Sequence, residues 1–276
     1  MNRIDFNKYN RILGISTGIL SFVVFALTVE PTASYWDCAE YISTSAKLQI
    51  GHPPGAPLFQ MLGAIFSIFA LELNQIAYAV NMMSVLSSAL TIVFLFWSIS
   101  LIGKEILDLT NSLKIDQAIK VFGSSFLGST SFTFTDSFWF NAVEAEVYAM
   151  ATLILAILFW LGLKWVDDFQ NQRADKWLVL ISFVLGLSFG VHFMGLLAIP
   201  SIGLLYYFKK YKKFNIKSFL IANIISVSIL LFIFKLLLPS TLSMFGNLEV
   251  FFVNDLGLPF NSGTIFSAIL ILSFFY

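Results

Sequence analysis

Apolar runs of roughly 20 residues, the length of a helix that crosses a bilayer, recur along this sequence. The first extends from Ile12 to Val29. Hydrophobic residues make up 58% of the chain and charged residues 12%, whereas a soluble domain carries about 25% charge. The pattern therefore predicts an all-α fold, a polytopic transmembrane helix bundle with about 7–8 spans. The later runs cover 57–71, 78–102, 118–134, 147–166, 177–191, 194–208 and 217–238, and a further run begins at 264.

The two ends of the sequence bear on the domain organisation. Three basic residues precede the first run, as in a signal peptide, but the run is long and no clean small-residue cleavage site follows it. We therefore expect a retained first helix. The last run, 264–276, has 13 residues, too few to cross about 30 Å of hydrocarbon. We expect a single transmembrane domain over residues 1–276 that belongs to a longer protein.

Positive charge predicts which loops lie inside. The run 57–71 would reach only about 22 Å as a helix, so we compared topologies in which it does and does not cross. If it does not cross, all basic residues except Lys47 and Lys235 fall on one side. The positive-inside rule favours this topology, with the N-terminus inside and an outer-side juxtamembrane helix at 57–71. The basic segments are 1–11, 103–120, 164–176 and 209–217.

This topology gathers acidic residues and both histidines on the outer side. The outer segments are a long loop at 30–77, a second loop around 135–146, a turn at 190–195 and a fourth loop at 239–263. Carboxylates in or near a membrane are costly and usually functional. Their convergence with the histidines predicts a site. The candidate site residues are Trp36, Asp37, Glu40, His52, Pro53, Pro54, Glu144, Glu146 and His192.

Asp37 and Glu40 allow several interpretations. They are three residues apart, so on a helix they share a face. They could serve as a general base and its partner, as metal ligands, or as a capping box at a helix N-terminus. Cys38 is the only cysteine of the sequence, so no intrachain disulfide can form and the redox compartment is not readable.

The other candidates also have structural alternatives. Glu144 and Glu146 precede an apolar run, where carboxylates favour the positive end of a helix dipole. His192 could be a hydrogen-bonded histidine of the bundle. The segment 51–55 could be only a stiff turn, because proline disfavours helix in the residue before it. Trp36 could mark the aromatic belt of the membrane interface.

The stretch WDCAEYISTSAKLQIGHPPGAPLF, residues 36–59, combines an Asp-x-x-Glu pair with a Gly-His-Pro-Pro-Gly-x-Pro-Leu segment. It resembles the signature of the family of the eukaryotic transmembrane O-mannosyltransferase of the endoplasmic reticulum. That family has bacterial branches, long described only as a domain of unknown function, and is part of the GT-C superfamily of membrane glycosyltransferases. VEAEVYAM at 143–150 and GLSFGVHFMGLLAIP at 186–200 also look like family blocks. Ala39 departs from the glycine common in the acidic motif.

The resemblance implies a GT-C type bundle and a glycosyltransferase. Such an enzyme moves a mannose-like sugar from a polyprenyl-phosphate donor to a hydroxyl of a protein or glycan acceptor at the outer face. Asp37 would be the general base that takes the hydroxyl proton, and Glu40 would orient the acceptor or Asp37. His52 and His192 would contact the donor phosphate, with Pro53 and Pro54 in the same binding segment as His52.

The resemblance also suggests roles for the remaining candidates. Glu144 and Glu146 would bind sugar hydroxyls or help to hold a divalent metal, and Trp36 would stack on a sugar. We expect no metal and no cofactor apart from the lipid donor. The expected partners are the donor, the acceptor and membrane lipid, while the zero net charge gives no reason to expect nucleic acid.

Two other function classes remain open from the sequence. A transporter or flippase for a lipid-linked substrate would show broken helices and charges near the bilayer midplane. A non-catalytic polytopic scaffold would not need two histidines and two acidic loops on one face. For the enzyme we expect a multi-pass protein of the cytoplasmic membrane of a bacterium, with its active face outside.

Overall fold

The structure is a computed structural model that describes residues 3–211 and 213–274. The chain forms two compact units, Met1–Lys212 and Lys213–Tyr276. Both units are almost entirely helical, as the apolar runs predict. The expectation of one transmembrane domain over residues 1–276 stays a prediction.

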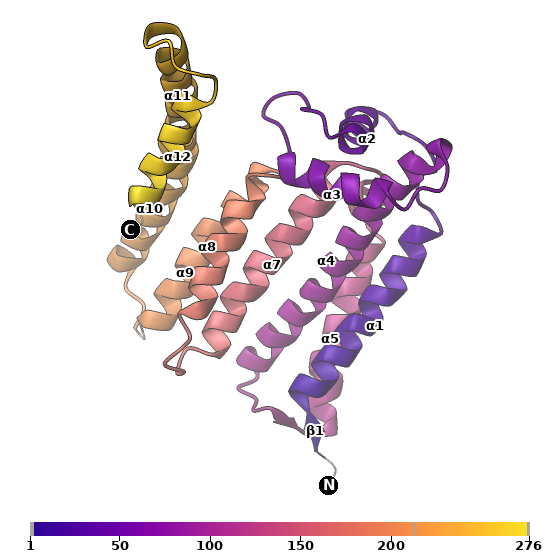
Figure 1. Ribbon diagram of the computed structural model, residues 1–276. Helices are drawn as coiled ribbons and strands as arrows, with labels where there is room; N and C mark the ends of the chain where they lie inside the picture. Colours follow the sequence, from indigo (N-terminus) through magenta and orange to yellow (C-terminus); the bar gives the residue numbers. More distant parts are fainter. Residues whose placement is uncertain (1–2, 212, 275–276) are drawn as a thin grey trace. The chain divides into compact units, whose positions relative to one another are not determined.

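The first unit is a bundle of long helices (Figure 1). The helices along the bundle are α1 Phe6–Ala26, α4 Ile76–Ile106, α5 Ile115–Thr133, α7 Val147–Asp167, α8 Lys176–Ser188 and α9 Ala198–Lys210, which the 3₁₀ helix η2 Phe193–Leu197 precedes. Shorter elements lie at one end of the bundle: α2 Cys38–Lys47, α3 Pro57–Ser67, the 3₁₀ helix η1 Leu73–Gln75 and α6 Asp136–Ala142. At the other end β1 Ile4–Asp5 pairs antiparallel with β2 Ser112–Leu113, so that Ile4 faces Leu113.

Helix α4 is the centre of the bundle and packs against α1, α5 and α7. Apart from Asn81 and the last turn, its residues are mostly apolar or small on every side, as in a helix surrounded by other helices. Close approach to α1 depends on Gly18, where an added Cβ would lie 2.3 Å from Val93 Cγ2 and 3.2 Å from the carbonyl oxygen of Ala89. Small residues at such contacts let helix backbones approach.

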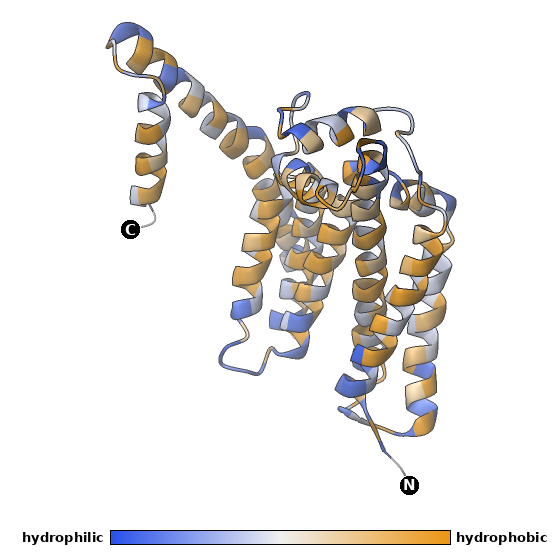
Figure 2. Ribbon diagram, turned by 45° about the vertical axis from the view of Figure 1, so that its right-hand side comes forward, coloured by the Kyte–Doolittle hydropathy of each residue, from blue (hydrophilic) through white to orange (hydrophobic). Residues whose placement is uncertain are grey.

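Hydrophilic residues concentrate at both ends of this bundle (Figure 2). At the end that carries the N-terminus, Lys104 binds Asp167 at 2.7 Å and Lys209 binds Glu105 at 3.2 Å. These ion pairs join the ends of α4, α7 and α9. Helices α2 and α3 lie at the opposite end, and α3 crosses the bundle end rather than running along it (Figure 1).

Among the described residues, four helical segments are long and apolar enough to cross a membrane. This agrees with a helical membrane protein but does not confirm the count of 7–8 spans. Helices α8 and α9 have 13 residues each and would reach about 20 Å, while α5 is less apolar. The side of a membrane on which α3 lies stays a prediction. The four segments are Phe6–Ala26, Leu73–Ile106, Val147–Asp167 and Ile216–Asp255.

In the second unit, the loop expected at 239–263 is wrong over most of its length. Helix continues without a break to Asp255, and a turn then leads to the last helix. Pro239 directly follows the expected apolar run 217–238, and proline often ends a helix because it lacks an amide donor and crowds the preceding turn. A π-helical turn at Ile233–Leu237 ends two residues before Pro239, and such single turns occur inside longer helices. The elements are α10 Ile216–Phe232, η3 Ile233–Leu237, α11 Leu238–Val250, η4 Phe251–Asp255 and α12 Ser262–Phe274.

The contact between α1 and α4 gives a stability prediction. Gly18→Ala should destabilise the bundle by about 1–3 kcal/mol, the usual cost of overpacking, and lower the thermal unfolding midpoint measured by tryptophan fluorescence. Gly123→Ala in α5 is the matched control, because no described atom lies within 4 Å of its added Cβ. It should be neutral or slightly stabilising. Equal midpoints for the two variants would contradict the packing described here.

Candidate functional site

The loop between α1 and α2 is fixed by a buried amide of α4. The Asn81 side chain is fully buried, and its Nδ2 donates to the carbonyl oxygens of Glu30 at 2.6 Å and Thr32 at 2.9 Å. Its Oδ1 lies 4.0 Å from the sulfur of Cys38. A buried amide without partners would cost about 1–3 kcal/mol. Asn81 therefore ties both the loop and the start of α2 to the bundle.

Asp37 and Glu40 lie at the start of α2 but do not form a capping box. Among the described residues of α2, no amide donates to the Asp37 side chain. Glu40 instead accepts the backbone N–H of His52 at 2.6 Å and pairs with His52 Nδ1 at 3.0 Å. His52 Nε2 lies 3.6 Å from Asp37 Oδ2. The imidazole thus bridges the two carboxylates.

The contact between His52 and Glu40 shifts the pKa values of both side chains. The hydrogen bond from the backbone N–H of His52 is the main cause that lowers the pKa of Glu40. The hydrogen bond to Glu40 is the main cause that raises the pKa of His52. Over the interval between these two pKa values Glu40 is ionised and His52 is protonated, so the side chains form an ion pair.

The same three side chains are the right types to hold a cation. One ligand atom from each of Asp37, Glu40 and His52 lies within 4.8 Å of the others, and carboxylate oxygen with imidazole nitrogen suits several divalent ions. A cation would have to displace the hydrogen bond of His52 to Glu40 and its contact with Asp37. The expectation that no metal is needed stays a prediction.

The segment that carries His52 docks on the turn that carries His192. The first amides of α3, those of Leu58 and Phe59, both donate to the carbonyl oxygen of Gly190, at 2.8 and 3.2 Å. An added Cβ at Gly190 would lie 2.7 Å from Leu58 Cβ, so the contact requires glycine. Segments that are far apart in the sequence thereby bring the two histidines to the same end of the bundle.

His192 differs from His52 in its environment. Its Nδ1 accepts the backbone N–H of Met194 at 3.1 Å, so the neutral ring carries its hydrogen on Nε2. Burial lowers the pKa of His192. The ring centroid lies 5.3 Å from that of Tyr148. His192 is therefore a neutral hydrogen-bond donor at pH 7, whereas His52 tends toward the charged form.

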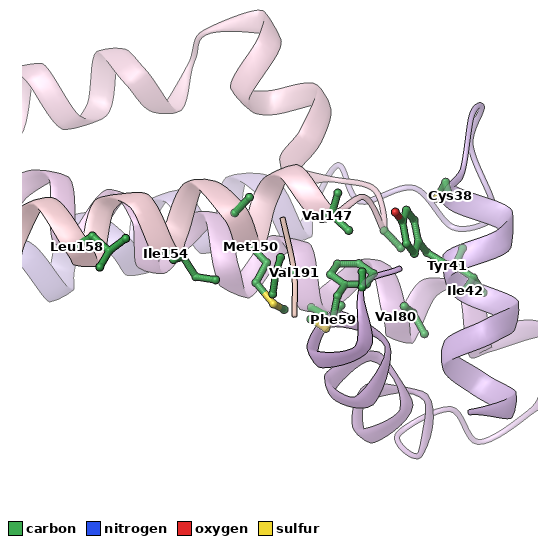
Figure 3. Packing of buried hydrophobic residues seen from close by; sticks show 14 of the residues in the cluster. Cys38, Tyr41, Ile42, Phe59, Val80, Val147, Met150, Ile154, Leu158 and Val191 are labelled. Atoms are coloured by element: carbon green, nitrogen blue, oxygen red, sulfur yellow. The ribbon is translucent and has the colours of Figure 1, made fainter. Parts of the chain in front are cut away.

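A cavity of about 210 Å³ lies where these segments meet. Packed residues of α2, α3, α4 and α7 support it (Figure 3), including an edge-to-face pair of Tyr41 and Phe59 with ring centroids 5.2 Å apart. The lining residues are Asp37, Tyr41, His52, Pro54, Gly55, Glu146, Val147, Tyr148, Phe189, Val191, His192 and Phe193.

Two of the side chains that line the cavity have strongly raised pKa values. Burial is the main cause that raises the pKa of Glu146 to about 7, and the charge of Asp37 adds to it. Burial is likewise the main cause that raises the pKa of Tyr41 to about 12. Clustered groups with shifted pKa values in a cavity are typical of functional sites.

The cavity does not take in every predicted residue. Glu40 stands behind His52 as its hydrogen-bond partner. Glu144 is buried and accepts a hydrogen bond from Ser34. The Trp36 side chain is 86% exposed, and Pro53 precedes the lining residue Pro54. Among the residues that the structure describes, the cavity lining includes none of these four.

Three residues of this region are not predicted by the sequence patterns. Tyr41 is four residues from Asp37 on α2, a helical spacing that places them on one face. Asn81 is the only amide side chain in the apolar run 78–102, a signal that could have been used. Tyr148 had no distinguishing signal. A larger groove of about 650 Å³ between α3 and α4 is mainly apolar and, among the described residues, includes none of the predicted site residues.

Similarity to known proteins was found by sequence. A profile of the protein O-mannosyl-transferase TMEM260 N-terminal domain matches residues 37–215. The protein O-mannosyl-transferase tmem260 of Dictyostelium discoideum is 26% identical over 154 residues, which cover 55% of this chain and 17% of the relative. The protein O-mannosyl-transferase TMEM260 of Mus musculus is 26% identical over 166 residues, which cover 60% of this chain and 21% of the relative.

The matches cover only part of these proteins. The chain spans about a fifth of the length of the two curated relatives. No solved structure matches the chain significantly. The matched region 37–215 begins at Asp37 and includes the residues that line the cavity.

The two histidines give a titration prediction. His52 should titrate above its ordinary pKa of 6.5 and His192 below it, as measured by NMR of the chain labelled in histidine. His192→Gln assigns the two signals. Glu40→Gln should move the pKa of His52 down toward 6.5 and leave His192 unchanged. Because the pKa of His52 is raised by folding, its contribution to stability is fully present below pH 6.5 and is lost as pH rises through the raised pKa. The reverse order of titration would contradict the hydrogen bonds of the site.

Proposed function

The chain belongs to the family of the protein O-mannosyl-transferase TMEM260 N-terminal domain, and on that premise we propose that it is a membrane glycosyltransferase of GT-C type. It transfers a mannose-like sugar from a polyprenyl-phosphate donor to a hydroxyl of a protein or glycan acceptor. The observation that carries the proposal is the cavity that Asp37, His52 and His192 line together at one end of an apolar bundle. A carboxylate and two nitrogen donors around one space are the groups that this transfer requires.

In this proposal Asp37 is the general base. Its carboxylate lines the cavity, its side chain is 53% exposed, and α2 does not use it as a cap. It accepts the proton of the acceptor hydroxyl as that oxygen bonds to the anomeric carbon. The bond between the anomeric carbon and the phosphate oxygen breaks, and the lipid phosphate leaves with the electron pair. The phosphate is a good leaving group, so a strong acid is not needed.

The two histidines bind the departing phosphate in complementary ways. His52, held by Glu40, supplies positive charge as well as a hydrogen bond. His192 supplies the neutral Nε2–H donor that the amide of Met194 fixes. Preorganised donors of this kind stabilise negative charge that develops in the transition state. No divalent metal is required in this scheme.

We further propose that this end of the bundle faces the outside. The basic segments 103–120 and 164–176 lie at the opposite end with the N-terminus (Figure 1), which the positive-inside rule assigns to the cytoplasm. The lipid donor then reaches the cavity from the outer leaflet. For a bacterial protein the membrane is the cytoplasmic membrane and the acceptor arrives from outside.

The distribution of charge favours this proposal over a transporter or flippase. In α4 and α7, which the structure describes throughout, the charged residues are Lys104, Glu105, Lys164 and Asp167, all in the last turns. Transporters bind substrate near the bilayer midplane, at broken helices. A non-catalytic scaffold has no use for the groups around the cavity.

The base assignment predicts the effect of Asp37→Asn. The amide keeps the shape but cannot take a proton, so transfer from radiolabelled polyprenyl-phosphate sugars should fall by about 10²–10⁴-fold, at equal protein level in membranes. Asp136→Asn in the second loop is the matched control and should keep full transfer. Equal transfer by Asp37→Asn and wild type would refute Asp37 as base. If no donor of the panel is consumed by wild type, the transporter and scaffold classes are favoured instead.

A further inference from the structure

Residues 143–146, named here the acidic strap, run beside the segment 30–38 that leads to Asp37. Three contacts follow one another in order along both segments. The backbone N–H of Glu30 donates to the carbonyl oxygen of Val143 at 2.9 Å. Further along, the Ser34 hydroxyl donates to the Glu144 carboxylate, and the backbone amide of Asp37 is among the groups that favour the ionised form of the Glu146 carboxylate.

The two carboxylates of the strap are buried, with 3% of Glu144 and 6% of Glu146 exposed. A buried carboxylate is costly unless hydrogen bonds satisfy it. The partners that satisfy Glu144 and Glu146 are a hydroxyl and backbone amides, and two of these belong to the segment 34–37. The strap and the segment therefore stabilise each other.

The backbone conformation of Trp36 indicates that contacts on either side of this residue fix the segment 30–38. Its φ is +61°, a left-handed conformation that residues with a Cβ disfavour. Such a conformation persists when the surrounding structure determines it. The Trp36 side chain is 86% exposed and cannot supply this constraint. The two strap contacts, at Ser34 and Asp37, lie on either side of it.

We propose that Glu144 and Glu146 are positioning residues that hold Asp37 at the cavity, rather than ligands of the sugar. This rests on the proposed function, in which Asp37 is the base. Glu144 acts through Ser34 and Glu146 through the amide of Asp37. Burial keeps Glu144 out of the cavity lining, and Glu146 is also buried, with the backbone amide of Asp37 close to its carboxylate, although its side chain borders the cavity.

The chain contains a natural reporter for this contact. Cys38 directly follows Asp37, is fully buried and is the only cysteine of the chain. In the wild-type chain in membranes opened to both sides, it should react slowly with a water-soluble maleimide. Glu146→Ala should raise the labelling rate by about tenfold, because the acceptor beside the amide of Asp37 is lost. Glu146→Gln keeps an acceptor oxygen and should label close to the wild-type rate.

Two further variants complete the labelling experiment. Ser34→Ala removes the contact with Glu144 and should also accelerate labelling of Cys38. This variant tests the acidic strap even if Glu146→Ala does not fold. Glu72→Ala is the control, since Glu72 is exposed and lies outside both segments. It should label as wild type does. Slow labelling of both Glu146→Ala and Ser34→Ala would overturn the proposal.

Transfer assays separate positioning from direct catalysis. Glu146→Ala should lower kcat and leave KM for the donor unchanged, and Glu146→Gln should restore kcat. If Glu146→Gln is as inactive as Glu146→Ala while Cys38 stays protected, Glu146 acts on the substrate itself and the positioning role is refuted. If wild type transfers no sugar at all, the proposed function fails, while the labelling rates still decide whether the strap holds the segment.

Discussion

The arrangement of the site depends on the burial of one amide, that of Asn81. A side-chain amide inside a bundle of apolar helices must find partners, because no water is available there to hydrogen-bond it. Its partners are backbone carbonyls of the loop 30–32, which fixes the path of the chain where it leaves α1. The start of α2 follows from that path, and so does the location of Asp37. The acidic strap then holds the same segment from the other side.

The two histidines illustrate how neighbours give one residue type two properties. His52 lies between two carboxylates at the surface, so its protonated form is favoured. His192 is half-buried with a backbone amide at Nδ1, so its neutral form is favoured. A phosphate between them would meet one cation and one neutral donor. The docking of α3 on Gly190 brings the two histidines to the same end of the bundle.

Much of the fold could be predicted from the sequence, because apolar runs must form helices in a bilayer, where every backbone polar group needs an internal partner. The run 57–71 lies across the bundle end, where its shortness suggested an interfacial helix. The loop expected at 239–263 is wrong because helix continues through Pro239, two residues after a π-helical turn. The span count could not be confirmed, because composition alone does not separate a crossing helix from the short helices α8 and α9.

The residues of the site could be predicted together only where they lie in one short segment of the sequence. Asp37, Glu40 and His52 were expected together and lie together. Glu144 and Glu146 look equivalent in the sequence, yet only Glu146 borders the cavity, because tertiary contacts with Ser34 and Asp37 give each its own partner. Asn81, Tyr41 and Tyr148 were not predicted, since a polar or aromatic residue within a helix does not indicate which distant segment it will contact.

The central claim is that the cavity between Asp37, His52 and His192 binds the sugar phosphate of a lipid donor. The most direct test is photocrosslinking with a polyprenyl-phosphate sugar whose reactive group is on the sugar, followed by mass spectrometry of the modified peptides. The account predicts crosslinks within 36–55 and 189–193, with competition by unlabelled donor. Competed crosslinks confined to the second unit, residues 213–274, would contradict it.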